Sequence, residues 1–309
     1  LLPRMIDGNP VDAMVSHMAK GISNTDTLKK IYEEYYRQFG LDKPLWQQFF
    51  IYIGNLLKGD LGVSFGLFPR RVNNILASAI PWTVALQLPA ILCGWLIGNV
   101  LGAFAAYKKG VYDKIIFPAA LFISSLPFFI LSIVLLYFFA VNLGWFPIGG
   151  GYDIQMTPSL TWPFILSVIQ HHTLPFLSIT LVTIGGQGIG MREMALYELN
   201  SDYVNFSKLM GIRERKIIGY VFRNSMLPQI TGLALSIGTM VAGALITEIV
   251  FNYPGIGTWL FSAIRRLDYP LISGCTLIIT LAVLLANFMI DLLYGVIDPR
   301  IKAAQMEEE

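Results

Sequence analysis

Residues 83–106 read TVALQLPAILCGWLIGNVLGAFAA and contain no Asp, Glu, Lys or Arg. A helix needs about 20 mostly apolar residues to cross the hydrocarbon core of a bilayer, because each residue advances it by only about 1.5 Å. A helix also satisfies its backbone hydrogen bonds internally, which a membrane-spanning segment requires. The stretch therefore predicts a transmembrane helix.

Four more stretches have the same character, at 115–141, 174–191, 227–251 and 271–294. Lysine and arginine are absent from all of them, as the high cost of a charge in the bilayer centre requires. The chain opens on Leu1-Leu2-Pro3-Arg4, and we expect residues 1–10 to be the end of a truncated first transmembrane helix. The predicted fold class is an all-α membrane protein with about six transmembrane helices.

The composition of the 309 residues agrees with this prediction. Hydrophobic residues make up 55% and charged residues 14%, and the mean hydropathy is +0.60. Soluble domains carry about 25% charged residues. The net charge of +2 is too small to indicate a nucleic-acid partner, so the lipid bilayer is the expected surrounding. Cys93 and Cys275 lie in apolar stretches and are interpreted as small buried hydrophobic residues.

Residues 11–80 are more polar and predict a small helical cap region rather than a membrane span. One apolar face, from Leu28 to Phe39, indicates a helix that ends at Gly40. A second helix is expected to begin near Pro44 and to end before Gly59. The expected transmembrane core is 81–295, and residues 296–309 form a tail.

The distribution of positive charge predicts the orientation. Lysines and arginines gather in the loop 107–114, in the segment 192–226 and at the C-terminal end, whereas 142–170 and 252–270 hold only Arg265 and Arg266. Because positive loops stay in the cytoplasm, we expect the first set to be cytoplasmic and the cap region to be external.

The cytoplasmic segment 192–226 is long for a connection between helices of a bundle, which takes about 2 to 8 residues. Its sequence favours a short helix, from Tyr203 to Met210, followed by Gly211 where a positive backbone angle is expected. The alternative is a surface helix that lies on the lipid headgroups.

The sequence has no motif of its own for chemistry. No Gly-Lys dipeptide occurs, so the phosphate-binding loop of ATPases is absent, and His17, His171 and His172 have no metal-ligand spacing. We therefore expect a protein that is not an enzyme and holds no cofactor. The alternatives are a secondary transporter or channel, which favours ionisable residues in mid-membrane, and an intramembrane enzyme.

Several short motifs follow one another along the chain, and with them the sequence resembles one family. They are Gly59-Asp60-Leu61-Gly62-x-Ser64, Phe146-Pro147-Ile148-Gly149-Gly150, the segment 202–212 with Gly211, Leu227-Pro228, Glu248-x-x-Phe251-x-x-Pro254-Gly255-x-Gly257, Asp268-Tyr269-Pro270 and Asp298-Pro299-Arg300. In this order they resemble the permeases of ATP-binding-cassette importers of the dipeptide, oligopeptide and nickel family, of the first-permease type. The small alanines that the family carries before its loop glycine are replaced here, around Ser207 and Leu209.

The resemblance implies a type I importer permease fold in a prokaryotic plasma membrane. It also implies partners: a second homologous permease, two ATPase subunits that bind ATP and Mg, and an external solute-binding protein. Transport of small peptides would follow alternating access, with oligosaccharides or nickel complexes as alternative substrates. The segment 192–226 would then carry a coupling helix that contacts an ATPase subunit, through Asp202, Tyr203, Ser207, Lys208, Gly211 and Ile212.

Polar residues of the stretch 227–251 are candidates for the translocation path: Ser236, Thr239, Thr247 and Glu248. The alternative for each is a hydrogen bond between helices, which such residues commonly make in lipid. Glu248 requires a partner or water in an apolar stretch, and its position favours a structural or gating role.

Overall fold

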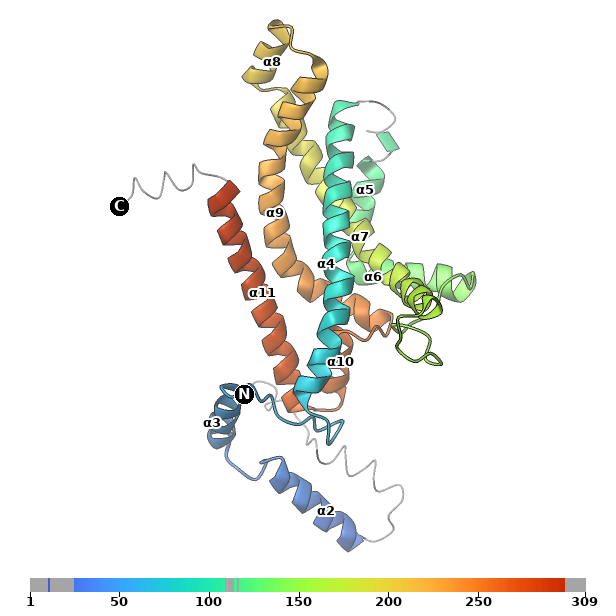
Figure 1. The fold of residues 1–309 in the computed structure, drawn as a ribbon, viewed down its shortest axis with the longest axis vertical. Helices are drawn as coiled ribbons and strands as arrows, with labels where there is room; N and C mark the ends of the chain where they lie inside the picture. The colour runs from blue at the N-terminus through green and yellow to red at the C-terminus, as the bar shows by residue number, and fades with distance from the viewer. Residues whose placement is uncertain (1–10, 12–24, 109, 111–113, 116, 298–309) are drawn as a thin grey trace, which may run out of the picture. The chain divides into compact units, whose positions relative to one another are not determined.

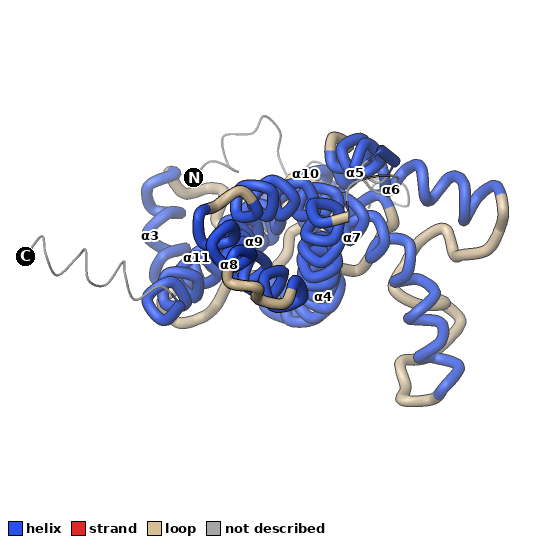
Figure 2. The backbone as a smooth tube through the Cα atoms, turned by 90° about the horizontal axis from the view of Figure 1, so that it is seen from above, coloured by secondary structure: helices blue, strands red, loops and turns tan. Residues whose placement is uncertain are grey.

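A computed structural model of the chain describes residues 11, 25–108, 110, 114–115 and 117–297, and only the backbone course at 25–28, 227, 231, 234–243 and 289–297. Over these residues Figures 1 and 2 show helices joined by loops, with a single isolated bridge between Val63 and Arg71. The predicted all-α class is confirmed. The described part of the chain forms two compact units, one from its residues up to 83 with 254–280 and one from 84–253 with its residues from 281 onward.

The first unit contains α2 (Thr25–Gln38), α3 (Leu45–Leu56), α10 (Ile256–Arg265) and the beginnings of α4 (Val72–Tyr107) and α11 (Tyr269–Ile297). α2 and α3 match the two helices expected in the cap region, and Gly40 after α2 has a φ of +66°. Residues 254–280, which the sequence assigned to the transmembrane core, join this unit.

Asp268 holds the first unit together. Its carboxylate, which is 1% exposed, accepts hydrogen bonds from the Ser64 hydroxyl and from the backbone N–H groups of Phe65 and Gly66, each of the latter at 3.0 Å. Two motifs that lie about 200 residues apart in the sequence therefore meet around one buried carboxylate. Backbone donors compensate the burial of its charge.

The second unit contains α5 (Phe117–Ser124), α6 (Phe128–Leu135) with the π-helical turn η4 (Leu136–Asn142), α7 (Trp162–Leu199), α8 (Asp202–Leu209) and α9 (Glu214–Val250). α7 packs against α5, α6 and α9. In this unit the motif 146–150 meets the end of α9, where the Gly150 N–H donates to the Phe251 carbonyl at 2.9 Å.

α4 and α7 approach each other at glycines. A Cβ placed on Gly102 would lie 2.2 Å from the carbonyl oxygen of Gly188, so the two backbones touch there. Gly98 has the same environment, with the Ile184 carbonyl oxygen 2.8 Å from its would-be Cβ. Small residues permit such close crossings in membranes.

Within the part of the chain that the structure describes, three helices are long and apolar enough to cross a membrane: α4, α7 and the part of α11 up to Phe288. The stretch 115–141 was expected to be one helix, but it is broken at Pro127 into α5 and α6, which are bent by 102° and form a fourth span if they act as one. Proline has no N–H to donate and clashes with the preceding turn, which explains the break. Residues 1–10, expected as a first span, and the tail from 298 lie outside the described residues, as do many side chains of the expected span 227–251.

The helices extend beyond the predicted spans. α4 begins at Val72 rather than near Thr83, and α7 covers 162–199 rather than 174–191. Hydropathy detects the part of a helix that lies in lipid, whereas a helix continues outside the bilayer until its backbone is capped. The segment 192–226 is accordingly mostly helical.

Candidate functional site

The connection between α7 and α9 is built around α8, a short helix at the ends of these two long ones (Figure 1). Ser201 precedes it in an extended conformation, and its hydroxyl donates to the Glu198 carbonyl at 2.6 Å. Asp202 lies in the first turn and Lys208 in the last. Both charges favour the helix, because its N-terminus is partially positive and its C-terminus partially negative.

Gly211 ends α8 with a φ of +71°, as predicted for this position. The N–H of Ile212 donates to the Ser207 carbonyl at 3.1 Å, and the N–H of Gly211 donates to the Lys208 carbonyl at 3.0 Å. This pair of bonds is the Schellman motif, which satisfies carbonyl groups at a helix end and requires a left-handed residue. The glycine fixes the angle between α8 and the start of α9.

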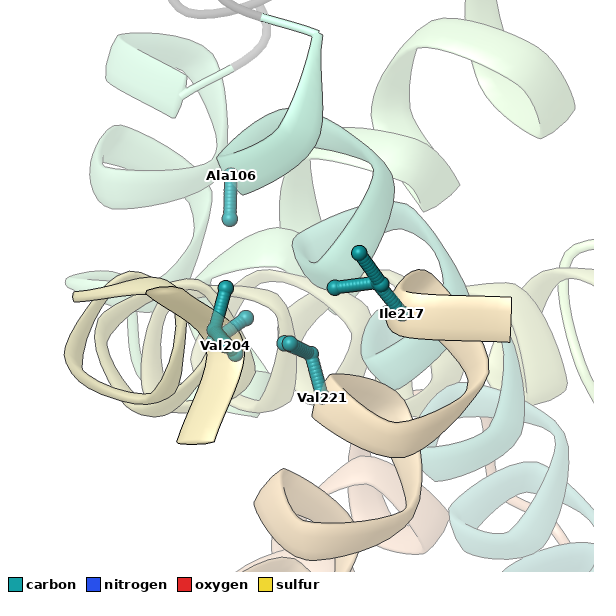
Figure 3. Packing of buried hydrophobic residues seen from close by; sticks show 5 residues of the cluster. Ala106, Val204, Ile217 and Val221 are labelled. Atoms are coloured by element: carbon teal, nitrogen blue, oxygen red, sulfur yellow. The ribbon is translucent and has the colours of Figure 1, made fainter. Parts of the chain in front are cut away.

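A small hydrophobic cluster anchors α8 to the long helices (Figure 3). Val204 of α8 is fully buried between Ala106 of α4, Ala195 of α7, and Ile217 and Val221 of α9. Burying an aliphatic side chain of this size stabilises the arrangement by about 1.5 to 3 kcal/mol. α8 is therefore held against four residues of the long helices, which we call the platform: Ala106, Ala195, Ile217 and Val221.

Hydrogen bonds between side chains also hold α8 in place. The Tyr203 hydroxyl donates to Glu198 Oε2 at 2.7 Å, and Asn224 Nδ2 lies 3.5 Å from the same oxygen. Burial raises the pKa of Tyr203 above its ordinary 10.0, and the hydrogen bond to Glu198 raises it further. Tyr203 therefore stays protonated and keeps donating at neutral pH.

Three large apolar side chains at the end of α8 are exposed, which sequence reasoning missed. Phe206, Leu209 and Met210 are 64%, 86% and 65% exposed, and we call them the α8 tip. Their spacing of i, i+3 and i+4 places them on one side of the helix, a signal that was present in the sequence.

The residues expected at the coupling surface divide into two groups. Three are exposed next to the α8 tip: Asp202, Lys208 and Gly211. Three face the platform: Tyr203 and Ile212 are half-buried, and Ser207 is 9% exposed. Tyr203 and Ile212 pack against the hydrophobic cluster, and all three residues of the second group are less accessible than those of the first.

Among the residues expected on a translocation path, Thr247 and Glu248 are fully buried within the chain. The Ser132 hydroxyl lies 3.2 Å from the Thr247 hydroxyl and 3.0 Å from that of Ser178, which joins α6, α7 and α9. Gln87 Nε2 donates to Glu248 Oε1 at 3.2 Å. These contacts are the hydrogen bonds between helices that were the alternative interpretation. The side chains of Ser236 and Thr239 lie outside the described residues.

Next to this network, His172 Nδ1 lies 2.9 Å from the hydroxyl of Tyr253, which is itself fully buried. His171 instead contacts the Ser167 carbonyl of its own helix, at 2.7 Å. The two histidines of the sequence pair therefore have separate partners.

The α8 tip is an exposed surface on a helix that is fixed in place. It presents an apolar surface of three side chains on a short helix fixed by a glycine turn, a buried valine and a tyrosine–glutamate bond. Exposed apolar clusters of this kind mark protein contacts, because they lose water contact on docking.

Known proteins resemble this chain over most of its length. Residues 98–303 match the family described as "Binding-protein-dependent transport system inner membrane component". The "Di/tripeptide transport system permease protein DppB" of Pseudomonas aeruginosa is 33% identical over 97% of this chain and 92% of its own length. The "Dipeptide transport system permease protein DppB" of Escherichia coli is 30% identical over 96% and 91%. The "Oligopeptide transport system permease protein AppB" of Bacillus subtilis is 30% identical over 95% and 90%.

A solved structure has a similar fold. It is a chain of the MetNI methionine ABC transporter in an inward-facing conformation, with a TM-score of 0.56 and 16% sequence identity. The match covers 72% of this chain and 96% of that one. The predicted permease fold is confirmed by this likeness.

Proposed function

The chain belongs to the family of binding-protein-dependent transport system inner membrane components, and on this premise we propose that it moves small peptides inward across the membrane, driven by ATPase subunits. It is a membrane permease component and not an enzyme. The observation that carries the proposal is the α8 tip, an exposed apolar surface on a rigidly held helix. A chain without a phosphate-binding loop needs such a surface to receive work from an ATPase.

Peptides are the proposed substrates because the relatives named above are described as carriers of di- and tripeptides, dipeptides and oligopeptides. Their identity of 30% to 33% extends over nearly the whole chain. None of these three relatives favours the oligosaccharide or the nickel-complex alternative.

The proposed complex contains this chain, a second related permease, two ATPase subunits and an external solute-binding protein. The α8 tip would dock into an ATPase subunit on the cytoplasmic side, where the basic residues Arg213, Arg215 and Lys216 follow it. Approach of the two ATPases would then move α8, and with it α7 and α9, because the platform joins all three. Access would alternate between the two sides of the membrane.

The orientation can be tested separately. With Cys93 and Cys275 replaced, a cysteine at Glu34 in α2 should react with an impermeant thiol reagent applied outside the cell. A cysteine at Arg215 should react only after the membrane is opened. Reaction of position 215 in intact cells, with position 34 protected, would contradict the proposed orientation.

Transport is tested by reconstituting the complete complex in liposomes and measuring solute uptake and ATP hydrolysis together. A labelled dipeptide presented with the binding protein should be taken up and should stimulate hydrolysis. An oligosaccharide and a nickel–histidine complex serve as competing substrates in the same assay. Uptake of one of these without peptide uptake would refute the substrate, whereas solute movement without ATP would refute the transporter class.

A further inference from the structure

α2 and α3, both in the first unit, differ in the character of their exposed side chains. α2 exposes charged and amide side chains: Lys29, Lys30, Glu33, Glu34, Arg37 and Gln38. α3, with the sequence LWQQFFIYIGNL, has no charged residue. A helix with the surface of α2 is suited to water, and one with the surface of α3 is not.

One face of α3 carries its most exposed apolar side chains. Trp46, Phe50 and Leu57, the last just beyond the helix end, are 62%, 66% and 84% exposed, and Ile53 between them is half-buried. Positions 46, 50, 53 and 57 follow a spacing of 4, 3 and 4 residues, so they form one continuous stripe. We call it the α3 stripe.

The opposite face of α3 is turned into the first unit. Gln48 is 8% exposed, and its Nε2 donates to the Lys43 carbonyl at 2.6 Å. Gln48, Tyr52 and Asn55 line a cavity of about 360 Å³ in this unit. The packing of this face leaves the α3 stripe pointing away from the rest of the first unit.

The end of α3 is tied to the start of a membrane-spanning helix. Asn73, the second residue of α4, donates from Nδ2 to the Gly59 carbonyl at 2.6 Å and accepts from the Leu61 N–H at 2.9 Å. The start of α11, another span, follows Asp268, which binds the segment 64–66. The segment that follows α3 is therefore fixed to the starts of α4 and α11 within the first unit.

The length and flanking charges of α3 favour a position along the membrane surface. Its 12 residues extend over about 18 Å, whereas a span needs about 30 Å. Lys43 and Lys58 lie just beyond its two ends, and both are exposed. Lysines in this position extend their ammonium groups to lipid phosphates, and tryptophan prefers the same interface.

We infer that α3 is a membrane-interface helix, with the α3 stripe inserted at the boundary between headgroups and acyl chains of phospholipids. Lys43 and Lys58 then bind the phosphates on either side. The helix was expected to be part of an external cap, and its apolar surface, its length and its flanking lysines fit the lipid interface of that region. A protein partner would also cover apolar groups, and the experiment distinguishes the two.

The test uses the complete complex in bilayers of phosphatidylethanolamine and phosphatidylglycerol. In a chain with Cys93→Ala and Cys275→Ala, a nitroxide label is attached to a cysteine at Phe50. Its relaxation by oxygen, which concentrates in lipid, is compared with its relaxation by a water-soluble nickel chelate. We expect the oxygen-to-nickel ratio at position 50 to exceed that at Glu34 of α2 severalfold.

Two further labels control for local effects. Asn55 lies on the opposite face of α3 and should give a lower ratio than position 50. Position 57, the most exposed of the α3 stripe, should give a high ratio and replaces position 50 if that variant fails to assemble. A ratio at 50 and 57 equal to that at 34 places the stripe in water and overturns the inference. Protection from both relaxants shows a protein cover and overturns it as well.

Discussion

The α8 tip exposes apolar side chains, whereas the hydrogen-bond network around Thr247 buries polar ones. At the tip, Leu209 and Met210 are exposed in a segment that lies outside the membrane spans. In the network, Thr247 and Glu248 are fully buried between helices of an apolar bundle. Each arrangement is unfavourable for an isolated chain in water and favourable in its own surroundings. Removing an apolar group from water favours docking, whereas hydrogen bonds between helices stabilise a fold within lipid.

Because of this difference, substitutions in the two regions should affect different properties, assembly of the complex in one and stability of the fold in the other. The α8 tip makes no contribution to the core of this chain, so its loss should affect the complex and leave the fold intact. The network joins α6, α7 and α9, so its loss should affect stability first. The predictions below test this division.

The largest effect is expected for Leu209→Asp, because it places a charge at the centre of the α8 tip. Loss of a central apolar contact typically weakens an interface by about 2 kcal/mol or more, and an unpaired charge adds to this. Association with the ATPase, measured by co-purification, and coupled peptide uptake should both be lost. Leu160→Asp is the matched control, since Leu160 is 98% exposed in the loop before α7. Equal loss in both variants would contradict the role of the tip.

A strong but smaller effect is expected for Gly211→Val. A β-branched residue at a φ of +71° is strained by about 1 kcal/mol or more, although a Cβ would meet no atom of this chain within 4 Å. Peptide uptake and stimulated ATP hydrolysis should fall sharply while membrane insertion persists. Gly211→Asn is the control, because asparagine tolerates the left-handed region, and it should retain most of the coupling. Normal uptake per ATP in the valine variant would show that the turn does not transmit work.

The network is tested by Glu248→Leu. Loss of the carboxylate leaves Gln87 Nε2 buried without this acceptor, which costs about 1 to 3 kcal/mol. The thermal unfolding midpoint in detergent should fall, while ATPase association in the surviving protein should not. The double variant Gln87→Leu/Glu248→Leu removes both partners and should recover much of the loss. A double variant that is no more stable than the single one would show that Glu248 acts through other contacts.

The smallest effect is expected for Tyr203→Phe, which removes one hydrogen bond of about 0.5 to 1.5 kcal/mol. Hydrogen exchange of the α8 amides should accelerate by roughly threefold to tenfold. Because folding raises the pKa of Tyr203 above 10.0, the bond contributes fully below pH 10.0 and is lost as the pH rises through the raised value. Protection in the natural protein should therefore be constant from about pH 7 to pH 9. A decline in that window, absent from the Phe variant, would contradict the assignment.

The fold was predictable where a single physical property decides it. Hydropathy identified the lipid-spanning parts of α4, α7 and α11, because a charge inside the bilayer is costly. It did not give the true start of α4 at Val72, since residues outside lipid obey backbone capping. The break at Pro127 could have been read from the proline itself.

For the candidate site, the sequence predicted the glycine turn that ends α8, but it did not predict which side chains of α8 are exposed. Gly211 was assigned a positive φ because a glycine followed a helical run and preceded a polar turn. Whether Ser207 or Leu209 faces outward depends on α8 docking onto Ala195 and Ile217, which lie on other helices. Such contacts have no local signature, although the spacing of Phe206, Leu209 and Met210 already indicated one apolar side.

The glycine crossing of α4 and α7 bears on transport, because the two backbones are in direct contact there. Where Gly102 touches Gly188, no side chain lies between the helices that could change its rotamer and let them slide. We therefore expect α4 and α7 to stay in contact at this crossing during transport. A covalent cross-link between the two helices there should then leave peptide uptake unchanged. Loss of uptake on cross-linking would show that the crossing opens during transport. A rigid crossing requires that helices move or bend at other places during transport, such as the bend at Pro127.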